Sequence, residues 1–335
     1  MPKSGKGEDR RRLLARLFNI KKCKQTMQKL TLILIAWVAS AIQKVTLTSA
    51  QIRDYQRDGV IVVKGLLSGQ SLRKAQVSAK RAIERGNRIG KLYRYVGFQG
   101  WRTDKTLRGI AFDSSAPRIA AELMQLDNER PLRVLKDALL ALSPGDESCG
   151  WHVDDKIFWP CHDDSELGAA DEGINVWITL SPLKASEGGG LAVAPGSSTA
   201  TWRETCRRFI GTFKPGAPQI TCDLATLSPE YNNRLDSMKV LHDMDPGDAI
   251  FHSRYCFHRG EQFDKGDTKV RYSIRYMPAD ARLFDNKIDV AMRKKSLADG
   301  VSLSAAGEYY PQVWPRSILS ERWRIRLGLL EKDQF

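Results

Sequence analysis

The hydrophobic pattern of this chain changes near residue 130. Before that point, apolar positions recur at helical spacing in three segments, and a short apolar run follows the first of them. The predicted helices cover residues 48–59, 68–85 and 117–124, and the predicted strand covers residues 60–63. Caps support the first helix, because Thr48 or Ser49 can accept backbone N–H bonds at its start and Gly59 suits a left-handed end.

After residue 130, short apolar stretches alternate with glycine, proline and aspartate turns. This spacing is typical of an antiparallel barrel or a double-sheet jelly roll. The predicted strands are residues 132–142, 150–154, 174–180, 191–194, 238–242, 249–252 and 270–276. We therefore predict a mostly β protein with flanking helices and a double-stranded β-helix core of the cupin-like, jelly-roll kind.

These patterns also predict the division of the chain. Residues 1–45 are set apart as a basic and apolar targeting or anchor segment, and residues 46–335 are predicted to form a single domain. Within it we expect a helical part, a jelly-roll core and a C-terminal extension, over residues 46–130, 131–280 and 281–335. Residues 322–330 are predicted to form a closing amphipathic helix.

The N-terminal segment joins a basic stretch to an apolar run. Residues 30–42 are apolar but shorter than the roughly 17–25 residues of a membrane span. They fit the centre of a signal peptide, with small residues at 39–41 for cleavage; an organelle presequence, an uncleaved signal anchor and a plain packed helix are alternatives. We expect organelle or secretory-pathway targeting through residues 1–42, with membrane association through residues 30–42 as an option, and a cytoplasmic location otherwise.

The net charge of +14 is unevenly distributed. Residues 1–29, with ten basic and two acidic residues, account for more than half of it. The remaining positive charge is enough to attract anionic small molecules. The chain lacks zinc-finger spacing, an RNA-binding aromatic pattern and a basic recognition helix, so we expect a small-molecule substrate and no nucleic-acid partner. We favour a monomer.

The six cysteines are scattered and include no CxxC pair. In a chain of this length a disulfide framework is not expected, and a reducing interior is the default. Cys256 is assigned to packing although it lies two residues before a histidine.

Candidate metal ligands are few, because the chain has only five histidines. All of them fall in the β-rich half: His152, His162, His242, His252 and His258. A non-haem iron oxygenase needs two neutral imidazoles and one carboxylate on one face of the metal, which leaves three positions for co-substrate and dioxygen. Residues i and i+2 of a strand point the same way, so His152-Val153-Asp154 supplies two of these ligands.

Two choices complete the predicted metal site. The competing sequence His162-Asp163-Asp164 lies in a polar, loop-like stretch that would hold two ligands less rigidly, so we prefer His152 and Asp154. The third ligand is expected on a neighbouring strand far downstream, where we assign His258, at a strand end. His252, within the preceding strand, is assigned to packing near the site. The predicted catalytic residues are the same three ligands.

The strand at 270–276 predicts an anion-binding position. Its alternation places Arg271, Ser273 and Arg275 on one face. Arginines that point into a barrel need an anion there, because an unpaired buried charge is costly. An arginine fork with a neighbouring hydroxyl can hold the distal carboxylate of 2-oxoglutarate, so we assign Arg271 with Ser273. Arg275 is the alternative, and a solvent-facing basic strand is another.

Further residues are predicted to line the pocket, with simple packing or surface positions as the alternative. Lys136 and Thr179 are assigned to the co-substrate. The substrate candidates are Asp155, Trp159 and Trp177, since two of them follow the metal motif directly and the third lies on an inner strand.

Taken in order, these motifs resemble the phytanoyl-CoA dioxygenase family of iron(II)/2-oxoglutarate oxygenases over residues 48–280. The resemblance rests on residues 57–67, Trp151-His-Val-Asp-Asp155, residues 175–180, Glu187-Gly-Gly-Gly and the following residues to Ser197, the Gly-Asp-Ala-Ile-Phe-His segment, His258 and Arg271-x-Ser273. One departure is Ser198, where family members often have histidine; that position is not a metal ligand. Asp154 is present, whereas related halogenases have a small residue there, so halogenation is not expected.

The resemblance implies an oxidoreductase that uses Fe(II), 2-oxoglutarate and dioxygen, with ascorbate as a stimulant. It implies oxidation of an unactivated C–H bond of a small, anionic molecule, by hydroxylation, desaturation or cyclisation, with release of succinate and CO2. Family substrates include acyl-CoA thioesters and natural-product intermediates, which suggests secondary metabolism. The alternatives are a cupin-like metal-dependent isomerase or hydrolase, and a non-catalytic jelly-roll binding protein.

Overall fold

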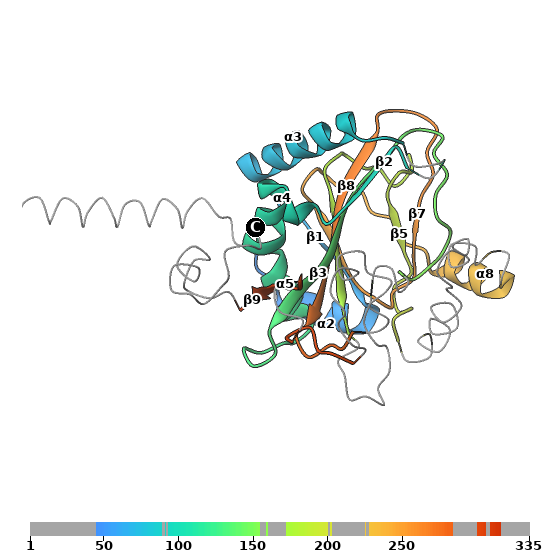
Figure 1. Cartoon of the computed structure of the whole chain (residues 1–335). Coiled ribbons are helices and arrows are strands. Elements are labelled where there is room, and N and C mark those ends of the chain that lie inside the picture. The colour runs from blue at the N-terminus through green and yellow to red at the C-terminus, as the bar shows by residue number, and fades with distance from the viewer. Residues whose placement is uncertain are drawn as a thin grey trace, which may run out of the picture. The chain divides into compact units, whose positions relative to one another are not determined.

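Two antiparallel sheets form the centre of the protein (Figure 1). The structure is a computed structural model. It describes residues 45–88, 91, 93–154, 159, 172–199, 202, 225, 228–283, 300–305 and 309–315. Thr46–Phe335 forms one unit by its internal contacts, and the two sheets belong to it.

The larger sheet has the strand order β1-β6-β4-β8-β3-β2, with β9 paired to β3. Its strands are β1 (Val60–Val63), β2 (Tyr95–Phe98), β3 (Leu132–Leu142), β4 (Ile174–Thr179), β6 (Ala249–Ser253), β8 (Lys269–Pro278) and β9 (Gln312–Trp314). Strand β4 lies between β6 and β8, so Asn175 is directly opposite both His252 and Arg275. This register brings polar side chains from the central strands to one place on the inner face.

The smaller sheet pairs β5 (Leu191–Val193) with β7 (His258–Gly260). Single bridges extend it, from His258 to His152 and from Val193 to Val240. Apolar residues of the two sheets, among them Trp177 and Val193, form a shared core. Two facing antiparallel sheets of this kind are a double-stranded β-helix, and the predicted fold class is confirmed.

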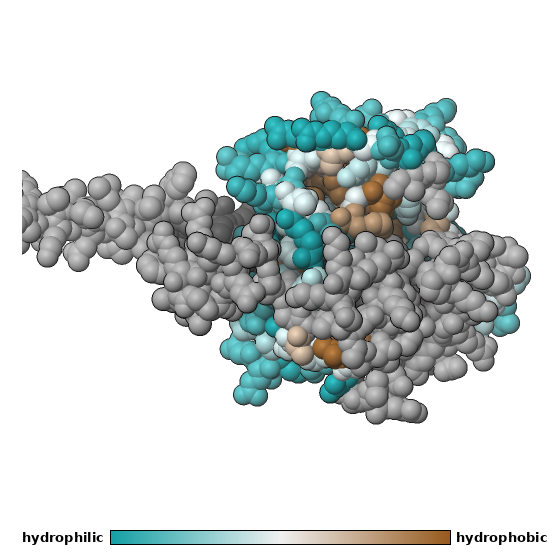
Figure 2. Space-filling model, viewed as in Figure 1, coloured by the Kyte–Doolittle hydropathy of each residue, from teal (hydrophilic) through white to brown (hydrophobic). Residues whose placement is uncertain are grey.

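Helices cover the outer face of the larger sheet. They are α2 (Ser49–Asp58), α3 (Gly69–Arg85), η1 (Gly100–Arg102), α4 (Lys105–Asp113) and α5 (Ala116–Leu123). Two tyrosines of β8 tie this layer to the sheet, because Tyr272 and Tyr276 donate hydrogen bonds to backbone carbonyls of α4. The outward side of α3 is hydrophilic (Figure 2), and a groove beside it is lined by Ile83, Leu180 and Val270, among others.

The predicted caps of the first helix are confirmed. Thr48 accepts a hydrogen bond from the backbone N–H of Gln51, whose side chain returns a bond to Thr48, and Gly59 ends the helix in the left-handed region at φ 69°. A side chain at Gly59 would also collide with Ser198. The end of α2 therefore fixes where β1 begins.

Some predicted elements were wrong or incomplete. Helix α4 and strands β2 and β9 were not predicted. The predicted strand at 238–242 is wrong in its first residue, since α8 (Pro229–Met238) runs to Met238, and only Val240 makes a bridge. The predicted strand at 150–154 reduces to the single bridge of His152. The predicted helix at 322–330 and the segment 1–44 lie outside the described residues.

Two further observations concern the cysteines and the helices. Cys149 is disulfide-bonded, so the expectation of reduced, unpaired cysteines is corrected at this position. Cys256 is free and buried, as its assignment to packing predicted.

Within the described part of the chain, no helix has the length and apolar content to cross a membrane.

Candidate active site

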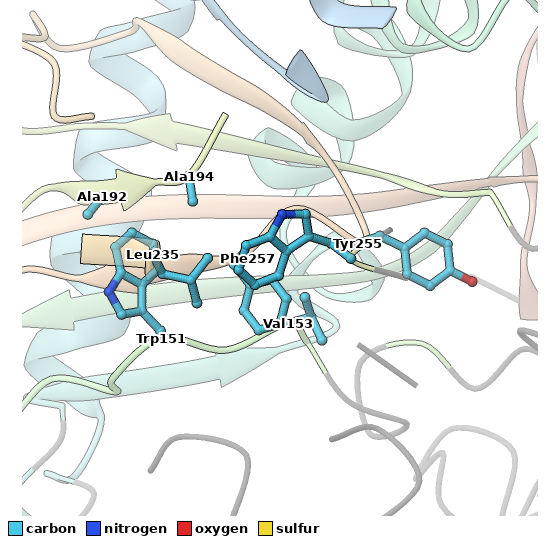
Figure 3. Close-up of a cluster of buried hydrophobic side chains, with 8 residues drawn as sticks. Trp151, Val153, Ala192, Ala194, Leu235, Tyr255 and Phe257 are labelled. Atoms are coloured by element: carbon cyan, nitrogen blue, oxygen red, sulfur yellow. The ribbon is translucent and has the colours of Figure 1, made fainter. Parts of the chain in front are cut away.

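The segment that carries the metal motif is anchored by its outward-facing side chains. Trp151 and Val153 pack with Leu235 of α8 and Phe257 in a buried cluster on the outer side of the smaller sheet (Figure 3). The Trp151 indole N–H also donates to Asp236 of α8 at 3.0 Å. Because side chains alternate along an extended chain, the residues between and after these two point to the interior.

His152, Asp154 and His258 meet in that interior. One ligand atom from each lies within 4.8 Å of the others. Oδ1 of Asp154 is 3.9 Å from Nε2 of His152 and 3.7 Å from Nε2 of His258. Two imidazoles and one carboxylate on one side of a common point are the donors that an Fe(II) oxygenase site requires. The competing pair at 162–164 lies outside the described residues.

Backbone carbonyls orient both imidazoles. Nδ1 of His152 lies 2.7 Å from the carbonyl of Gly150, and Nδ1 of His258 lies 3.0 Å from the carbonyl of Cys256. A carbonyl only accepts, so each Nδ1 carries the proton and each Nε2 presents its lone pair to the metal position. Burial lowers the pKa of His152 to about 4, and the neighbouring His258 adds to this. His152 is therefore a neutral ligand at neutral pH.

Asp154 uses its two oxygens differently. Oδ1 faces the imidazoles, while Oδ2 accepts hydrogen bonds from Nε and Nη2 of Arg275, at 2.9 and 2.7 Å, and from Nδ2 of Asn175 at 3.2 Å. Burial alone would raise the pKa of this carboxyl, but the Arg275 charge and the two histidines outweigh burial and hold the pKa well below its usual range. Asp154 is thus a fixed carboxylate.

His252 lies close to the site without joining the metal group. Its ring centroid is 4.6 Å from that of His258, and its Nδ1 lies 3.0 Å from the carbonyl of Ser253. Burial lowers the pKa of His252 to about 3, so it is neutral. Its position agrees with the predicted packing role near the site.

Arg271 is a buried guanidinium on the inner face of β8. Its Cζ lies 5.6 Å from the ring of Tyr93 and 5.7 Å from the ring of Trp177, and Thr179 is directly opposite it on β4. Burial lowers its pKa. Among the described residues no carboxylate forms an ion pair with it; its neighbours are the ring of Trp177 and Tyr93, whose side chain also forms a hydrogen bond with it.

The other predicted co-substrate residues lie on the same inner surface, and their roles remain predictions. Ser273 donates its hydroxyl to Oδ1 of Asn175 at 2.6 Å, and Thr179 donates to the carbonyl of Ser181 at 2.6 Å. Both hydroxyl protons are therefore already used. Lys136 is buried opposite Arg275, with Nζ 5.3 Å from the ring centroid of Phe98.

The predicted substrate residues separate in space. Trp177 packs between the sheets beside Arg271. Trp159 lies in another buried cluster, with Leu135 and Met277. Asp155 lies outside the described residues. Sequence reasoning missed Asn175 and saw Arg275 only as an alternative anchor, although strand alternation places both on the inner face.

A carboxylate-and-two-histidine donor set inside a double-stranded β-helix defines the class of non-haem iron oxygenases. The model of the phytanoyl-CoA dioxygenase (PhyH) family matches residues 55–265, and the chain belongs to this family. It is therefore an oxidoreductase of the iron(II)- and 2-oxoglutarate-dependent kind.

Solved structures share the fold at low sequence identity. The carbocyclase SnoK from nogalamycin biosynthesis, described as non-heme and alpha-ketoglutarate-dependent, is 21% identical, with a TM-score of 0.60 over 80% of this chain and 97% of its own. The epimerase SnoN, in complex with Fe3+, alpha-ketoglutarate and nogalamycin RO, is 18% identical, with a TM-score of 0.58 over 79% and 97%. EctD from S. alaskensis, with 2-oxoglutarate and 5-hydroxyectoine, is 17% identical, with a TM-score of 0.52 over 71% and 78%. No curated protein matches the sequence.

Proposed function

We propose that this protein binds Fe(II) through His152, Asp154 and His258 and binds 2-oxoglutarate through Arg271, in order to oxidise an unactivated C–H bond of a small anionic molecule. The observation that carries the proposal is Arg271, which is buried on the same face of β8 as Arg275 and has no carboxylate partner in the described residues. A buried guanidinium needs an anion, and the free carboxylate of a chelated 2-oxo acid supplies one.

The charges of the site favour a dianion. Asp154 and Arg275 neutralise each other, so the two positive charges of Fe(II) and the one of Arg271 are left to be balanced. A 2-oxo dicarboxylate places one carboxylate at each of these positive centres. Lys136, buried on the same inner surface, adds a further positive charge that suits an anionic ligand.

The protein's own residues bind, orient and exclude water. The two imidazoles hold lone pairs toward the metal, Arg271 fixes the far end of the co-substrate, and Trp177 closes the space between the sheets. When bound, iron with 2-oxoglutarate and dioxygen supplies the oxidising chemistry and yields succinate and CO2. We propose hydroxylation as the outcome, with desaturation or cyclisation as the alternatives.

The substrate class is supported by charge and by the neighbours. The chain outside residues 1–29 is still net basic, which attracts anions. Neighbours of the same fold are named for a carbocyclase and an epimerase of nogalamycin biosynthesis. We therefore propose a small anionic intermediate of secondary metabolism. Screening such compounds for substrate-stimulated succinate formation tests this: stimulation only by neutral or cationic compounds would contradict it.

Arg271→Gln tests the co-substrate site. The variant removes the charge and the fork, and a charge-assisted bond is worth about 1.5–3 kcal/mol, so we expect the affinity for 2-oxoglutarate to fall at least about 10-fold. Anaerobic calorimetry of the Fe(II)-loaded protein measures it. Arg85→Gln, at an exposed position of α3, is the matched control and should bind like wild type. Equal affinities for 2-oxoglutarate in the two variants would rule out Arg271 as the anchor. If the wild-type protein bound metal but not 2-oxoglutarate, an isomerase or hydrolase would be favoured instead.

The location of the protein stays a proposal that rests on the sequence alone. We propose that residues 1–42 direct it to an organelle or the secretory pathway. A fluorescent protein fused behind residues 1–45 should leave the cytoplasm, and diffuse cytoplasmic fluorescence would contradict this.

A further inference from the structure

The metal carboxylate is fastened to the opposite sheet. Asp154 follows the bridge between His152 and β7 of the smaller sheet, whereas its partners Asn175 and Arg275 are directly opposite each other on β4 and β8 of the larger sheet. The Asp154 side chain thus connects the two sheets. Asn175 and Arg275 both donate to Oδ2, the oxygen that faces away from the imidazoles.

Three N–H donors converge on that one oxygen. Arg275 supplies two and Asn175 one. A carboxylate oxygen has two lone pairs, so Oδ2 is saturated and cannot also bind a metal ion. Asp154 is left with Oδ1 as its only metal-binding atom. A second Asp154 oxygen on the ion would fill one of the three positions that co-substrate and dioxygen need.

A fourth residue orients the third donor. The hydroxyl of Ser273 donates to Oδ1 of Asn175 at 2.6 Å, which leaves the amide NH2 of Asn175 pointing at Asp154. Ser273, Asn175 and Arg275 are all buried. These donors are therefore shielded from water in the folded protein, and the bonds run in one chain from Ser273 through Asn175 to Asp154.

We infer that Arg275, with Asn175 and Ser273, is a positioning group that restricts Asp154 to one metal bond and so keeps the iron's co-substrate positions open. The inference rests on the proposed function in that the metal is iron. It gives Ser273 a different task from Arg271 on the same strand, since Ser273 acts through the metal ligand and Arg271 through the co-substrate.

Metal affinity and coordination test the inference in the full chain. Arg275→Met removes both donors at similar size, and loss of such outer partners typically weakens metal binding about 10–100-fold. We expect that loss for Fe(II) under anaerobic conditions. With Co(II) in place of iron, we expect a visible spectrum altered toward higher coordination. Arg271→Met, a buried arginine on the same face of the same strand, is the matched control and should keep metal affinity and spectrum while losing 2-oxoglutarate.

Ser273→Ala is the milder variant in case Arg275→Met does not fold, which circular dichroism reveals. A positioning role predicts weaker Fe(II) binding in Ser273→Ala, whereas a co-substrate role predicts normal Fe(II) binding and weaker 2-oxoglutarate binding. Wild-type metal affinity and spectrum in Ser273→Ala, or in a folded Arg275→Met, overturn the inference. If wild-type protein itself binds no Fe(II), the proposed function fails instead.

Discussion

Each metal-binding imidazole is oriented by the backbone of its own segment. His152 uses the carbonyl two residues before it, and His258 likewise uses the carbonyl two residues before it. This local arrangement sets the tautomer without any further side chain, so the sequence spacing carries most of the information. The carboxylate is different, because its partners come from residues more than twenty positions away.

At the scale of single residues, His258 and His252 are neighbours with different proposed roles, so their variants should differ in Fe(II) binding. His258→Ala removes a ligand and should abolish stoichiometric Fe(II) binding. His252→Phe replaces a buried, neutral ring that lies outside the metal group, and should keep one Fe(II) per chain. Anaerobic metal titration measures both. Loss of the metal in His252→Phe together with retention in His258→Ala would reverse the assignment.

At the scale of elements, the alternation of side chains in segment 151–154 couples the stability of the fold to the geometry of the metal site. In the segment 151–154 the outward residues bury apolar surface against α8 while the inward residues are ligands. A shift of one residue would exchange these two sets. The packing of Trp151 and Val153 against α8 therefore fixes the register of the segment, and with it the direction in which His152 and Asp154 point.

Trp151→Ala tests this coupling. Truncating a buried tryptophan costs about 3–5 kcal/mol, and here the bond to Asp236 is lost as well. We expect a lower free energy of unfolding in urea and, in the protein that remains folded, weaker Fe(II) binding. Leu235→Ala, which opens the same cluster from α8, is the control and should destabilise with a smaller effect on the metal. Unchanged stability in Trp151→Ala would show that the cluster does not anchor the segment.

Asp137 joins the helical layer to the larger sheet and should give a pH dependence. It accepts hydrogen bonds from the backbone N–H of Trp101 and from the Tyr272 hydroxyl, and burial raises its pKa to about 6. The folded state then binds more protons than the unfolded state between about pH 4 and 6. The free energy of unfolding should therefore fall as pH rises through that window.

Asp137→Asn removes the titrating group, so that fall should be absent from the variant when both proteins are unfolded in urea at pH values from 4 to 7. Parallel pH curves for wild type and variant would contradict the assignment.

At the scale of the whole molecule, the sequence predicts most of the sandwich and the three residues that the structure brings together as a candidate metal group. The ligands follow from periodicity and spacing, and the comparisons support the fold and family. Helix α4 was missed because Gly109 interrupts its pattern; its contacts with Tyr272 and Tyr276, which no local pattern shows, stabilise it. Strand β2 was missed because it contains a glycine and is only partly buried.

The partners of Asp154 could not be predicted for a related reason. Alternation places Arg275 on the inner face, but whether it meets a ligand or the co-substrate depends on the register of β8 against β4. Only the three-dimensional structure shows that Arg275 donates to Asp154, and this is why the co-substrate role is proposed for Arg271.

The most direct test of the central claim is succinate formation from 2-oxoglutarate by purified protein supplied with Fe(II), dioxygen and ascorbate. We expect succinate from wild type, none above background from His152→Ala, and none from wild type when Fe(II) is chelated. Equal succinate from wild type and His152→Ala, or no succinate from folded, iron-loaded wild type with a panel of anionic substrates, would contradict the account.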